Sequence, residues 1–286
     1  MKVISEDTQK RVLALHDLSC FGSCSLTVAL PIISAFGHDC IPLPNSLLST
    51  HTGIDGFTML DLTPNMRPIM EHWGRLGLDF DCIYTGFLGN DEQIDIAADT
   101  IDRLADDDTL VVVDPAMADN GELYPTFGPD FPAHMRKLCA RADILKPNIT
   151  EACFLLGLDY RNGPYTEEWI HGILRGLSDL GPGRIVLTGV YFDNSELGAA
   201  IYDREADSLE YIFDDTVPGI YYGTGDIFCS VLVGALTSGK TLRDSVELAV
   251  EFTREAIART YKAGTNPKYG VNFEAGLPGL IRRIGH

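Results

Sequence analysis

Short, wholly apolar segments alternate along this chain with longer segments of helical periodicity, and this alternation restricts the fold more than any other feature. Residues 110–113 are aliphatic at every position, so a strand there has to be buried on both faces. Helices must then cover both faces of a mostly parallel sheet. We therefore expect an α/β protein with three layers (α/β/α) around a central, mostly parallel sheet.

The individual elements follow from periodicity, turn residues and helix-terminating glycines. Strands are expected at residues 12–15, 40–43, 82–84, 110–113, 143–146 and 184–188, with an antiparallel pair at 199–202 and 209–213. Helices are expected at residues 22–36, 64–77, 91–104, 132–142, 149–156, 166–180, 223–238, 242–263 and 277–284. Segment 45–56, rich in Ser, Thr, Gly and His, is expected to be a loop or flap. With no linker or internal repeat, one domain over residues 1–286 is expected.

The chain is strongly acidic, with a formal charge of −19 at pH 7. Such a charge repels nucleic acid and anionic membranes, and no apolar run approaches the ~20 residues that span a bilayer. The N-terminal stretch is too polar for a signal peptide. The seven cysteines have no zinc-like spacing and are typical of a reducing cytosol. We expect a cytoplasmic protein that binds small molecules, in which Cys20, Cys24 and Cys229 are buried structural thiols.

Several polar residues and glycines directly follow the expected strands. In open α/β sheets, ligands bind at the carboxyl ends of the strands, so these positions predict the site. They are Asp17, Gly86, Asp114, Asn148 and Thr188.

Gly223-Thr224-Gly225-Asp226 opens a long expected helix. The glycines let the backbone approach a ligand closely, and the helix N-terminus offers free amides and a positive dipole to an anion. A carboxylate beside that anion can take the proton of an attacking alcohol. The alternative is an ordinary glycine turn with an Asp that favours the helix dipole. On the tetrapeptide alone the two interpretations are equally good.

Three further positions could supply metal or phosphate groups. Asn148 and Glu151 are three residues apart at a helix start, where they could hold a hydrated Mg²⁺ or form a capping pair. Asp114, after the most apolar strand, could organise Mg²⁺ or a monovalent cation such as K⁺, or simply begin a turn before Pro115. Lys146 could contact phosphate or be a solvated strand end.

Together these segments resemble the ribokinase superfamily and, within it, the pyridoxal kinase branch. The resemblance extends from residue 11 to about residue 261, and each matching stretch is weak alone. Five in the right order at strand ends make the resemblance strong. The stretches are NS…STHTG at 45–53, YTGFLG at 84–89, DPAM at 114–117, PNITE at 147–151 and GTGD at 223–226.

The resemblance implies a role for each position and a homodimeric kinase that uses ATP and Mg²⁺. Asp226 would be the base that activates the 5′-hydroxymethyl group of a pyridoxal-type substrate. The remaining roles are these: Gly223, Thr224 and Gly225 in the anion hole; Asp114, Asn148 and Glu151 at metal and phosphate; Lys146 and Thr188 at the nucleotide; Asp214 and Val217 near the segment over ATP; His51 and Thr52 at the pyridine ring.

Two departures concern the acceptor. Asp17 stands where pyridoxal kinases usually carry Ser, and Phe87 where they often carry Tyr. Both positions line the substrate side in the family, and a carboxylate at Asp17 favours a cationic or donor-rich substrate. Our hypothesis is that pyridoxamine or pyridoxine is preferred over pyridoxal. The alternatives are a hydroxymethylpyrimidine kinase, a sugar or nucleoside kinase, and a non-catalytic vitamin- or nucleotide-binding protein.

Overall fold

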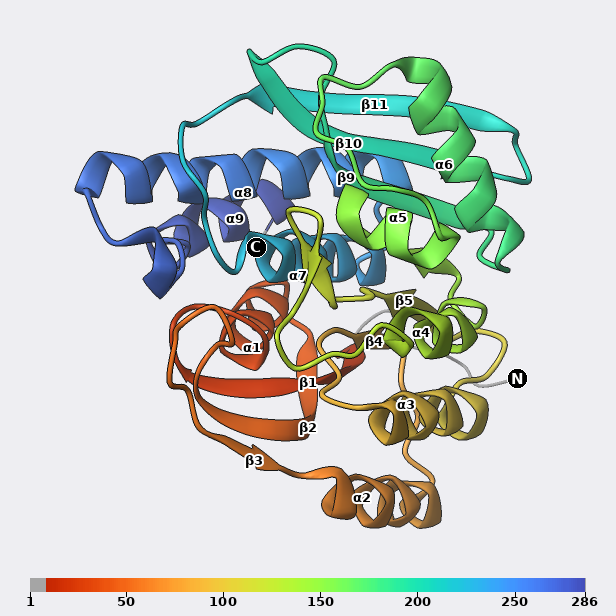
Figure 1. The fold of residues 1–286 in the computed structure, drawn as a ribbon. Helices are drawn as coiled ribbons and strands as arrows, with labels where there is room; N and C mark the ends of the chain where they lie inside the picture. The colour runs from red at the N-terminus through yellow and green to blue at the C-terminus, as the bar shows by residue number, and fades with distance from the viewer. Residues whose placement is uncertain (1–8, 286) are drawn as a thin grey trace.

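A nine-stranded sheet forms the centre of the computed structural model, which describes residues 9–285 (Figure 1). The prediction about a signal peptide falls partly on residues outside that range. The strand order is β11-β10-β9-β8-β5-β4-β1-β2-β3. The parallel strands are β1 (Arg11–Phe21), β2 (Asp39–Thr50), β4 (Cys82–Thr85), β5 (Leu110–Val113), β8 (Ile144–Leu145) and β9 (Arg184–Val190). The antiparallel strands are β3 (Met59–Asp61) at one edge and β10 (Glu196–Asp203) and β11 (Ser208–Asp215) at the other.

Helices cover both faces of this sheet, which confirms the three-layer α/β prediction (Figure 1). None of those within residues 9–285 is long and apolar enough to cross a membrane. One face carries α1 (Leu26–Ala35), α7 (Thr224–Thr237), α8 (Leu242–Ala263) and α9 (Leu277–Ile284). The other carries α2 (Thr63–Leu76), α3 (Asp91–Leu104), α4 (Phe131–Cys139), α5 (Ile149–Leu156) and α6 (Glu167–Asp179).

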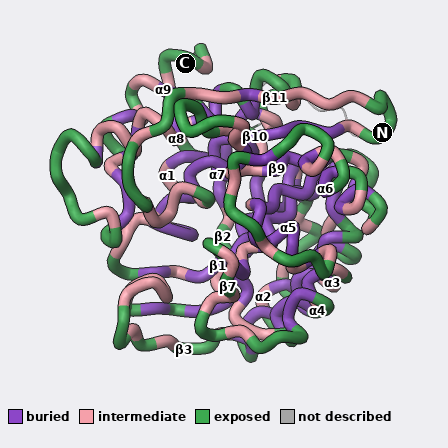
Figure 2. Tube along the Cα trace, turned by 45° about the horizontal axis from the view of Figure 1, so that its top comes forward, coloured by how far each residue is buried: buried purple, intermediate pink, exposed green. Residues whose placement is uncertain are grey.

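The strands divide the core between the two helical layers by simple alternation. Leu13 and Leu15 of β1 pack toward the α2–α6 layer, whereas Val12 and Ala14 pack toward α1 and α7. All four are fully buried, and the central strands lie in the buried interior of the molecule (Figure 2). The continuous aliphatic runs in the sequence are therefore explained by burial on both faces.

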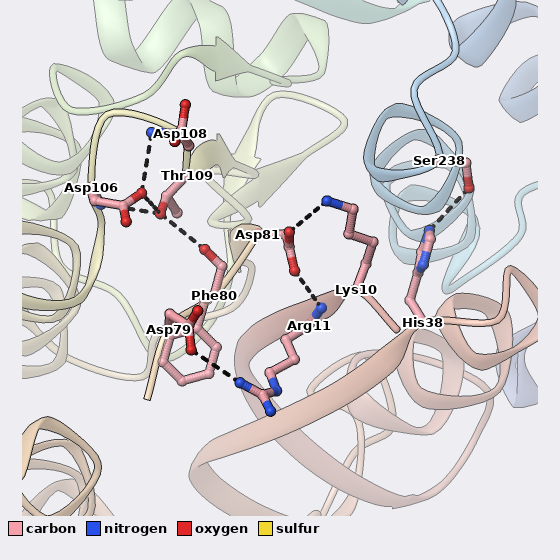
Figure 3. Close-up of polar contacts among 10 residues, drawn as sticks. All are labelled: Lys10, Arg11, His38, Asp79, Phe80, Asp81, Asp106, Asp108, Thr109 and Ser238. Atoms are coloured by element: carbon pink, nitrogen blue, oxygen red, sulfur yellow. Dashed lines mark hydrogen bonds and ion pairs between the residues drawn. The ribbon is translucent and has the colours of Figure 1, made fainter. Parts of the chain in front are cut away.

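The amino ends of the central strands are closed by polar contacts (Figure 3). Asp81 accepts hydrogen bonds from Lys10 Nζ at 2.9 Å and from the Arg11 amide at 2.8 Å. Arg11 also pairs with Asp79 at 3.1 Å. The predicted site residues gather at the carboxyl ends of the strands. These contacts lie at the opposite end of the strands.

The prediction of a loop over residues 45–56 is wrong for its first half. β2 continues to Thr50, because β1 pairs with it as far as Thr50 and the short antiparallel strand β3 pairs with Ser46–Leu48 on the other side. Only residues 51–56 form turns. Local composition suggested a loop, but pairing with strands on both sides decided the conformation.

Other boundaries also differ from the predictions. Helix α1 starts at Leu26, since Gly22 and Ser25 have positive φ angles of 95° and 51° in the loop before it. A two-stranded hairpin of β6 (Ala118–Asp119) and β7 (Glu122–Leu123) was not predicted. Such short strands are too brief to leave a periodic signal in the sequence.

The cysteines agree with the predictions in all but one case. Cys24 and Cys229 are buried free thiols, as expected. Cys20 is exposed, so its prediction as a buried thiol was wrong. It lies near the carboxyl end of β1, where the strand passes beyond the core and its last two residues are exposed.

Candidate active site

Four neighbouring strands end in register at the carboxyl edge of the sheet. Their last common row is Leu15, Thr85, Val113 and Leu145. The next residues along each strand form a further row, on the face that α7 covers because side chains alternate. This row, which we call the floor row, consists of His16, Gly86, Asp114 and Lys146.

Asp114 and Lys146 form a buried ion pair in the floor row. Lys146 Nζ donates to Asp114 Oδ2 at 2.7 Å, and both side chains are nearly inaccessible to solvent. Burial acts to lower the pKa of Lys146, but the Asp114 carboxylate outweighs it and the net shift is upward, so Lys146 is a cation. Lys146 Nζ also lies 3.5 Å from the position that a Cβ would take at Gly225. The only cation of the floor row therefore faces the start of α7.

The N-terminus of α7 carries no side-chain cap. Its N-cap residue Gly223 has a φ of 77° and no side chain to accept from the first amides, in contrast to Asn90 of α3 and Thr241 of α8. A Cβ at Gly223 would lie 2.0 Å from the Ser23 carbonyl oxygen, so only glycine allows this approach. The free amides and the helix dipole beside Lys146 make this an electropositive place suited to an anion.

Asp226 stands in the first turn of α7 beside that place. Burial raises its pKa to about 7; the Ser25 backbone amide opposes this shift, while the carboxylates of Asp114 and Asp17 add to it. A carboxyl group with this pKa exchanges protons near neutral pH, which is what general-base chemistry requires.

Asp17 was predicted to follow a strand directly, but it lies inside β1. The pairing of β1 with β2 shifts register between His16 and Leu18, and such an irregularity re-aims the side chains around it. Asp17 is 3% exposed and accepts from Ser19 Oγ at 2.8 Å. Burial raises its pKa, with the Ser25 and Ser19 hydroxyls acting in the opposite direction.

The start of α5 holds the β6–β7 hairpin in place. Asn148 and Glu151 form a complete capping box, and Asn148 Nδ2 also donates to the Ala118 carbonyl at 2.9 Å. Thr150 Oγ1 accepts from the Gly121 amide at 3.1 Å. The two oxygens of Glu151 accept from the amides of Asn148 at 2.8 Å and Met117 at 3.2 Å.

The carboxylates of Asp114 and Glu151 were the predicted Mg²⁺ ligands. Burial raises the pKa of Glu151, and the nearby Asp114 carboxylate raises it further. Within residues 9–285, no three His, Cys, Asp or Glu side chains gather into a metal-binding group. Two buried carboxylates that repel each other suit a hydrated Mg²⁺, which keeps several waters and takes one or two protein carboxylates besides phosphate.

His51 and Thr52 lie in the turn after β2. The His51 ring is fixed at both nitrogens, since Nδ1 accepts from the Gly53 amide at 3.1 Å and Nε2 contacts the Lys268 carbonyl at 2.7 Å. It stacks on Tyr222 with 5.1 Å between ring centroids. Only the face or edge of the ring is left for a ligand, and Thr52 beside it is half-buried.

Phe87 is 7% exposed and belongs to an aromatic cluster, with its ring centroid 5.5 Å from that of Phe127 and 6.5 Å from that of Tyr124. Its carbonyl accepts from Asn45 Nδ2 at 2.5 Å. This contact joins the end of β4 to β2 and fixes the backbone that follows Gly86.

The remaining predicted nucleotide residues lie further out. Thr188 is inside β9, not after it, and bridges to Asn148. Asp214 belongs to β11 and pairs with Arg254 at 3.6 Å. Val217 is half-buried in the segment between β11 and α7. The structure therefore brings Asp17, Asp114, Lys146 and Gly223–Asp226 together. Thr188, Asp214 and Val217 lie outside this group, on β9, on β11 and in the segment after β11.

Three residues of the site were missed in the sequence. Ser25 directs its amide to Asp226 and its hydroxyl to Asp17, from a backbone with φ of 51° that no local pattern announces. Burial raises the pKa of Tyr124, and the carboxylates of Glu151 and Asp226 raise it further. His16 belongs to the floor row. Of the three, His16 alone had a signal in the sequence, a polar side chain at the end of an apolar strand.

Comparisons with known proteins match the whole architecture. Residues 75–271 match the family model described as phosphomethylpyrimidine kinase. A provisionally named phosphomethylpyrimidine kinase from Bacteroides thetaiotaomicron, crystallised with pyridoxal, is 37% identical with a TM-score of 0.92 over 96% of each chain. Pyridoxal kinase from Lactobacillus plantarum is 33% identical with a TM-score of 0.86 over 97% of each chain. The pyridoxine/pyridoxal/pyridoxamine kinase of Bordetella avium is 25% identical over 87% of this chain and 85% of its own length.

Proposed function

Because this chain belongs to the ribokinase-like family of pyridoxal and phosphomethylpyrimidine kinases, we propose that it phosphorylates the 5′-hydroxymethyl group of a B6 vitamer with ATP. The observation that carries the proposal is the convergence at the start of α7. There an uncapped helix N-terminus, the Lys146 ammonium and the Asp226 carboxyl group lie together.

In this proposal Asp226 acts as the base. It takes the proton of the substrate hydroxyl group while that oxygen forms a bond to the γ-phosphorus of ATP. The bond from the γ-phosphorus to the bridging oxygen breaks, and ADP leaves with the electron pair. The amides of Gly223–Gly225 and the Lys146 ammonium stabilise the negative charge of the group in transfer.

The proposal also assigns residues to the metal ion and to the nucleotide. Asp114 and Glu151 would hold Mg²⁺ through water, and the ion would neutralise phosphate charge. Asn148, Thr188, Asp214 and Val217 would surround the nucleotide. Whether K⁺ is also needed is tested by comparing turnover in potassium, sodium and choline chloride.

The direct test mixes the protein, Mg-ATP and each acceptor and measures ADP. Pyridoxal, pyridoxamine and pyridoxine are expected to give ADP and the corresponding 5′-phosphate. Tight binding of a vitamer without ADP formation would instead support a non-catalytic binding protein.

A hydroxymethylpyrimidine kinase is the second candidate, and the name of the matching family model favours it. Both reactions phosphorylate a hydroxymethyl group on a nitrogen heterocycle, so the same catalytic groups serve either. Including 4-amino-5-hydroxymethyl-2-methylpyrimidine in the panel separates the two, because kcat/KM for the true acceptor should exceed the others by orders of magnitude.

The choice among vitamers depends on Asp17 in our proposal. A buried carboxyl group beside Asp226 favours a cationic or donor-rich acceptor, so pyridoxamine or pyridoxine should be preferred over pyridoxal. Asp17→Ser is expected to shift the ratios of kcat/KM toward pyridoxal, by roughly tenfold for one lost charged hydrogen bond. Unchanged ratios would contradict this role.

We also propose that the protein is a homodimer in the cytoplasm. Leu47 of β2 and Leu60 of the edge strand β3 are paired, and both are exposed, which suits burial against a second copy. Sedimentation velocity should give a mass near twice 31.3 kDa. A single species at the monomer mass over the micromolar range would exclude the dimer.

A further inference from the structure

His16 is a fully buried histidine to which the proposed reaction gives no role. It is 0% exposed at the end of the apolar part of β1. Among the described residues, neither ring nitrogen has a hydrogen-bond partner. Each unsatisfied buried nitrogen costs stability, on the order of 1–3 kcal/mol. An apolar side chain of the same size would avoid that cost.

The sheet reserves space for this ring. A Cβ at Gly86 would lie 2.0 Å from His16 Cε1 and 2.2 Å from Nδ1, so the imidazole occupies the place of a side chain at Gly86. The ring also packs edge-on against Tyr84, with 4.3 Å between centroids. Glycine at position 86 is therefore what allows His16 to reach across the floor row.

The ring is thereby brought toward the Asp114–Lys146 pair. Gly86 and Asp114 follow paired residues on adjacent strands, which lie roughly 4.8 Å apart. The Lys146 ammonium donates one hydrogen bond to Asp114 and faces the start of α7. It lies close enough for its charge to act on His16, whose pKa is lowered to about 3 by burial and by Lys146.

A neutral imidazole presents one acceptor and one donor nitrogen. Lys146 has three N–H groups, of which Asp114 takes one. A buried water in contact with an imidazole nitrogen, an ammonium group and a carboxylate has the two to four polar partners that such waters require.

We propose that His16 is a positioning residue: its ring accepts a hydrogen bond from a buried water that Lys146 also contacts, and so holds the ammonium group toward the phosphate at α7. Lys146 is then restrained by Asp114 on one side and by the water bound to His16 on the other. The remaining N–H of Lys146 then points to the uncapped helix N-terminus. This inference rests on the proposed kinase function.

The test is His16→Phe, which keeps a flat ring against Tyr84 and above Gly86 but removes both nitrogens. Turnover and kcat/KM for ATP are expected to fall by about 10- to 100-fold, the range for a lost hydrogen bond to a charged group. The melting temperature should change little, because the ring keeps its packing against Tyr84 while the nitrogen that the water does not contact, an unsatisfied polar atom, leaves the core. His16→Gln, which retains a donor and an acceptor, should recover much of the lost rate.

The matched control is His38→Phe. His38 is also buried, but its Nε2 contacts the Gly234 carbonyl at 3.1 Å and Ser238 Oγ at 3.0 Å, at the other end of the sheet (Figure 3). This variant should lose stability and keep the kcat/KM of the wild type. The pair of variants separates a positioning role from a role in folding.

Wild-type kcat and KM for ATP in His16→Phe would overturn the inference and leave the kinase function standing. Absence of ADP formation by the wild type would overturn the function instead. If His16→Phe does not fold, ¹⁵N-histidine spectra of the wild type decide. A neutral His16 whose ring nitrogen shifts move on addition of Mg-ADP supports the inference, and unchanged shifts overturn it.

Discussion

At the scale of single residues, the site gathers acidic groups around one cation. Burial raises the pKa of Asp226 to about 7, and the carboxylates of Asp114 and Asp17 act in the same direction. Lys146 is the cation among these groups and acts in the opposite direction. Crowding carboxylates in this way costs stability, and such costs are typical of groups set up for proton transfer. The arrangement keeps Asp226 close to the point of gaining or losing its proton.

The role of Asp226 as base predicts a pH profile. Below pH 7 its raised pKa leaves the carboxyl group protonated, so kcat/KM should fall about tenfold per pH unit along a limb centred near 7. Asp226→Asn should lower kcat by ~10²–10⁴ and leave ADP affinity nearly unchanged. Surviving turnover in this variant would show that Asp226 is not the base.

The raised pKa of Asp226 also makes the stability of the folded protein depend on pH. A raised folded-state pKa means that the native protein is favoured at low pH, and that this contribution is lost as the pH rises through 7. Asp226→Asn should therefore be at least as stable as the wild type at pH 8, which urea denaturation can measure.

The buried Asp114–Lys146 pair predicts a large loss of stability. Asp114→Asn leaves the Lys146 ammonium without its counter-charge, which should cost about 3–5 kcal/mol in the free energy of unfolding. The control is Asp102→Asn, which breaks the exposed pair with Arg141 at 2.8 Å and 2.9 Å. That loss should be about 1 kcal/mol or less. Equal losses in urea denaturation would contradict the buried-pair account.

At the scale of elements, the start of α5 joins helix capping to the geometry of the site. Asn148, Thr150 and Glu151 satisfy the helix end and also hold residues 117–121. Capping and metal binding were alternatives in the sequence; the structure contains the cap, and the two roles are compatible. The hairpin in turn leads to Tyr124 at the site.

This coupling predicts a local effect of Asn148→Ala. The lost cap should cost about 1–2 kcal/mol, and amide exchange should quicken in residues 118–123 because the contact with the Ala118 carbonyl disappears. Asn90→Ala removes the corresponding cap of α3. It should destabilise the protein similarly without affecting exchange in the hairpin. Hydrogen-exchange mass spectrometry distinguishes the two; quicker hairpin exchange in both variants would contradict the coupling.

At the scale of the whole molecule, the proposed function requires a protein with a formal charge of −19 to bind an anionic nucleotide. The groups proposed to attract phosphate, Lys146 and the start of α7, act locally, and Lys146 is shielded from solvent, whereas the acidic surface acts over long range. Salt screens exposed charges much more than buried ones. Added salt should therefore weaken the repulsion more than the attraction.

KM for Mg-ATP is accordingly expected to fall by a few-fold when choline chloride rises from about 20 mM to about 200 mM, where screening shortens the range of surface charges. A KM that rises with salt would mean that exposed cations dominate nucleotide capture. Choline is used because it does not occupy a site for K⁺ or Mg²⁺.

Much of the fold could be predicted because its signals are local. Aliphatic runs such as 110–113 require burial on both faces, and the glycines and Asp of residues 223–226 mark the start of α7. The capping pair Asn148–Glu151 and the final helix 277–284 depend only on neighbours a few residues away. These properties were determined by the sequence alone, and with them the family.

Tertiary structure decided which side chains meet. Residues 45–50 became a strand because β1 and β3 pair with them from the two sides, and a shift in register with β2 turned Asp17 inward from the middle of β1. His16 reaches over Gly86 only because β1 and β4 end in register. Such pairings join residues tens of positions apart, and no local propensity encodes them. The sequence thus determined the elements and the family, whereas strand register determined the geometry of the site.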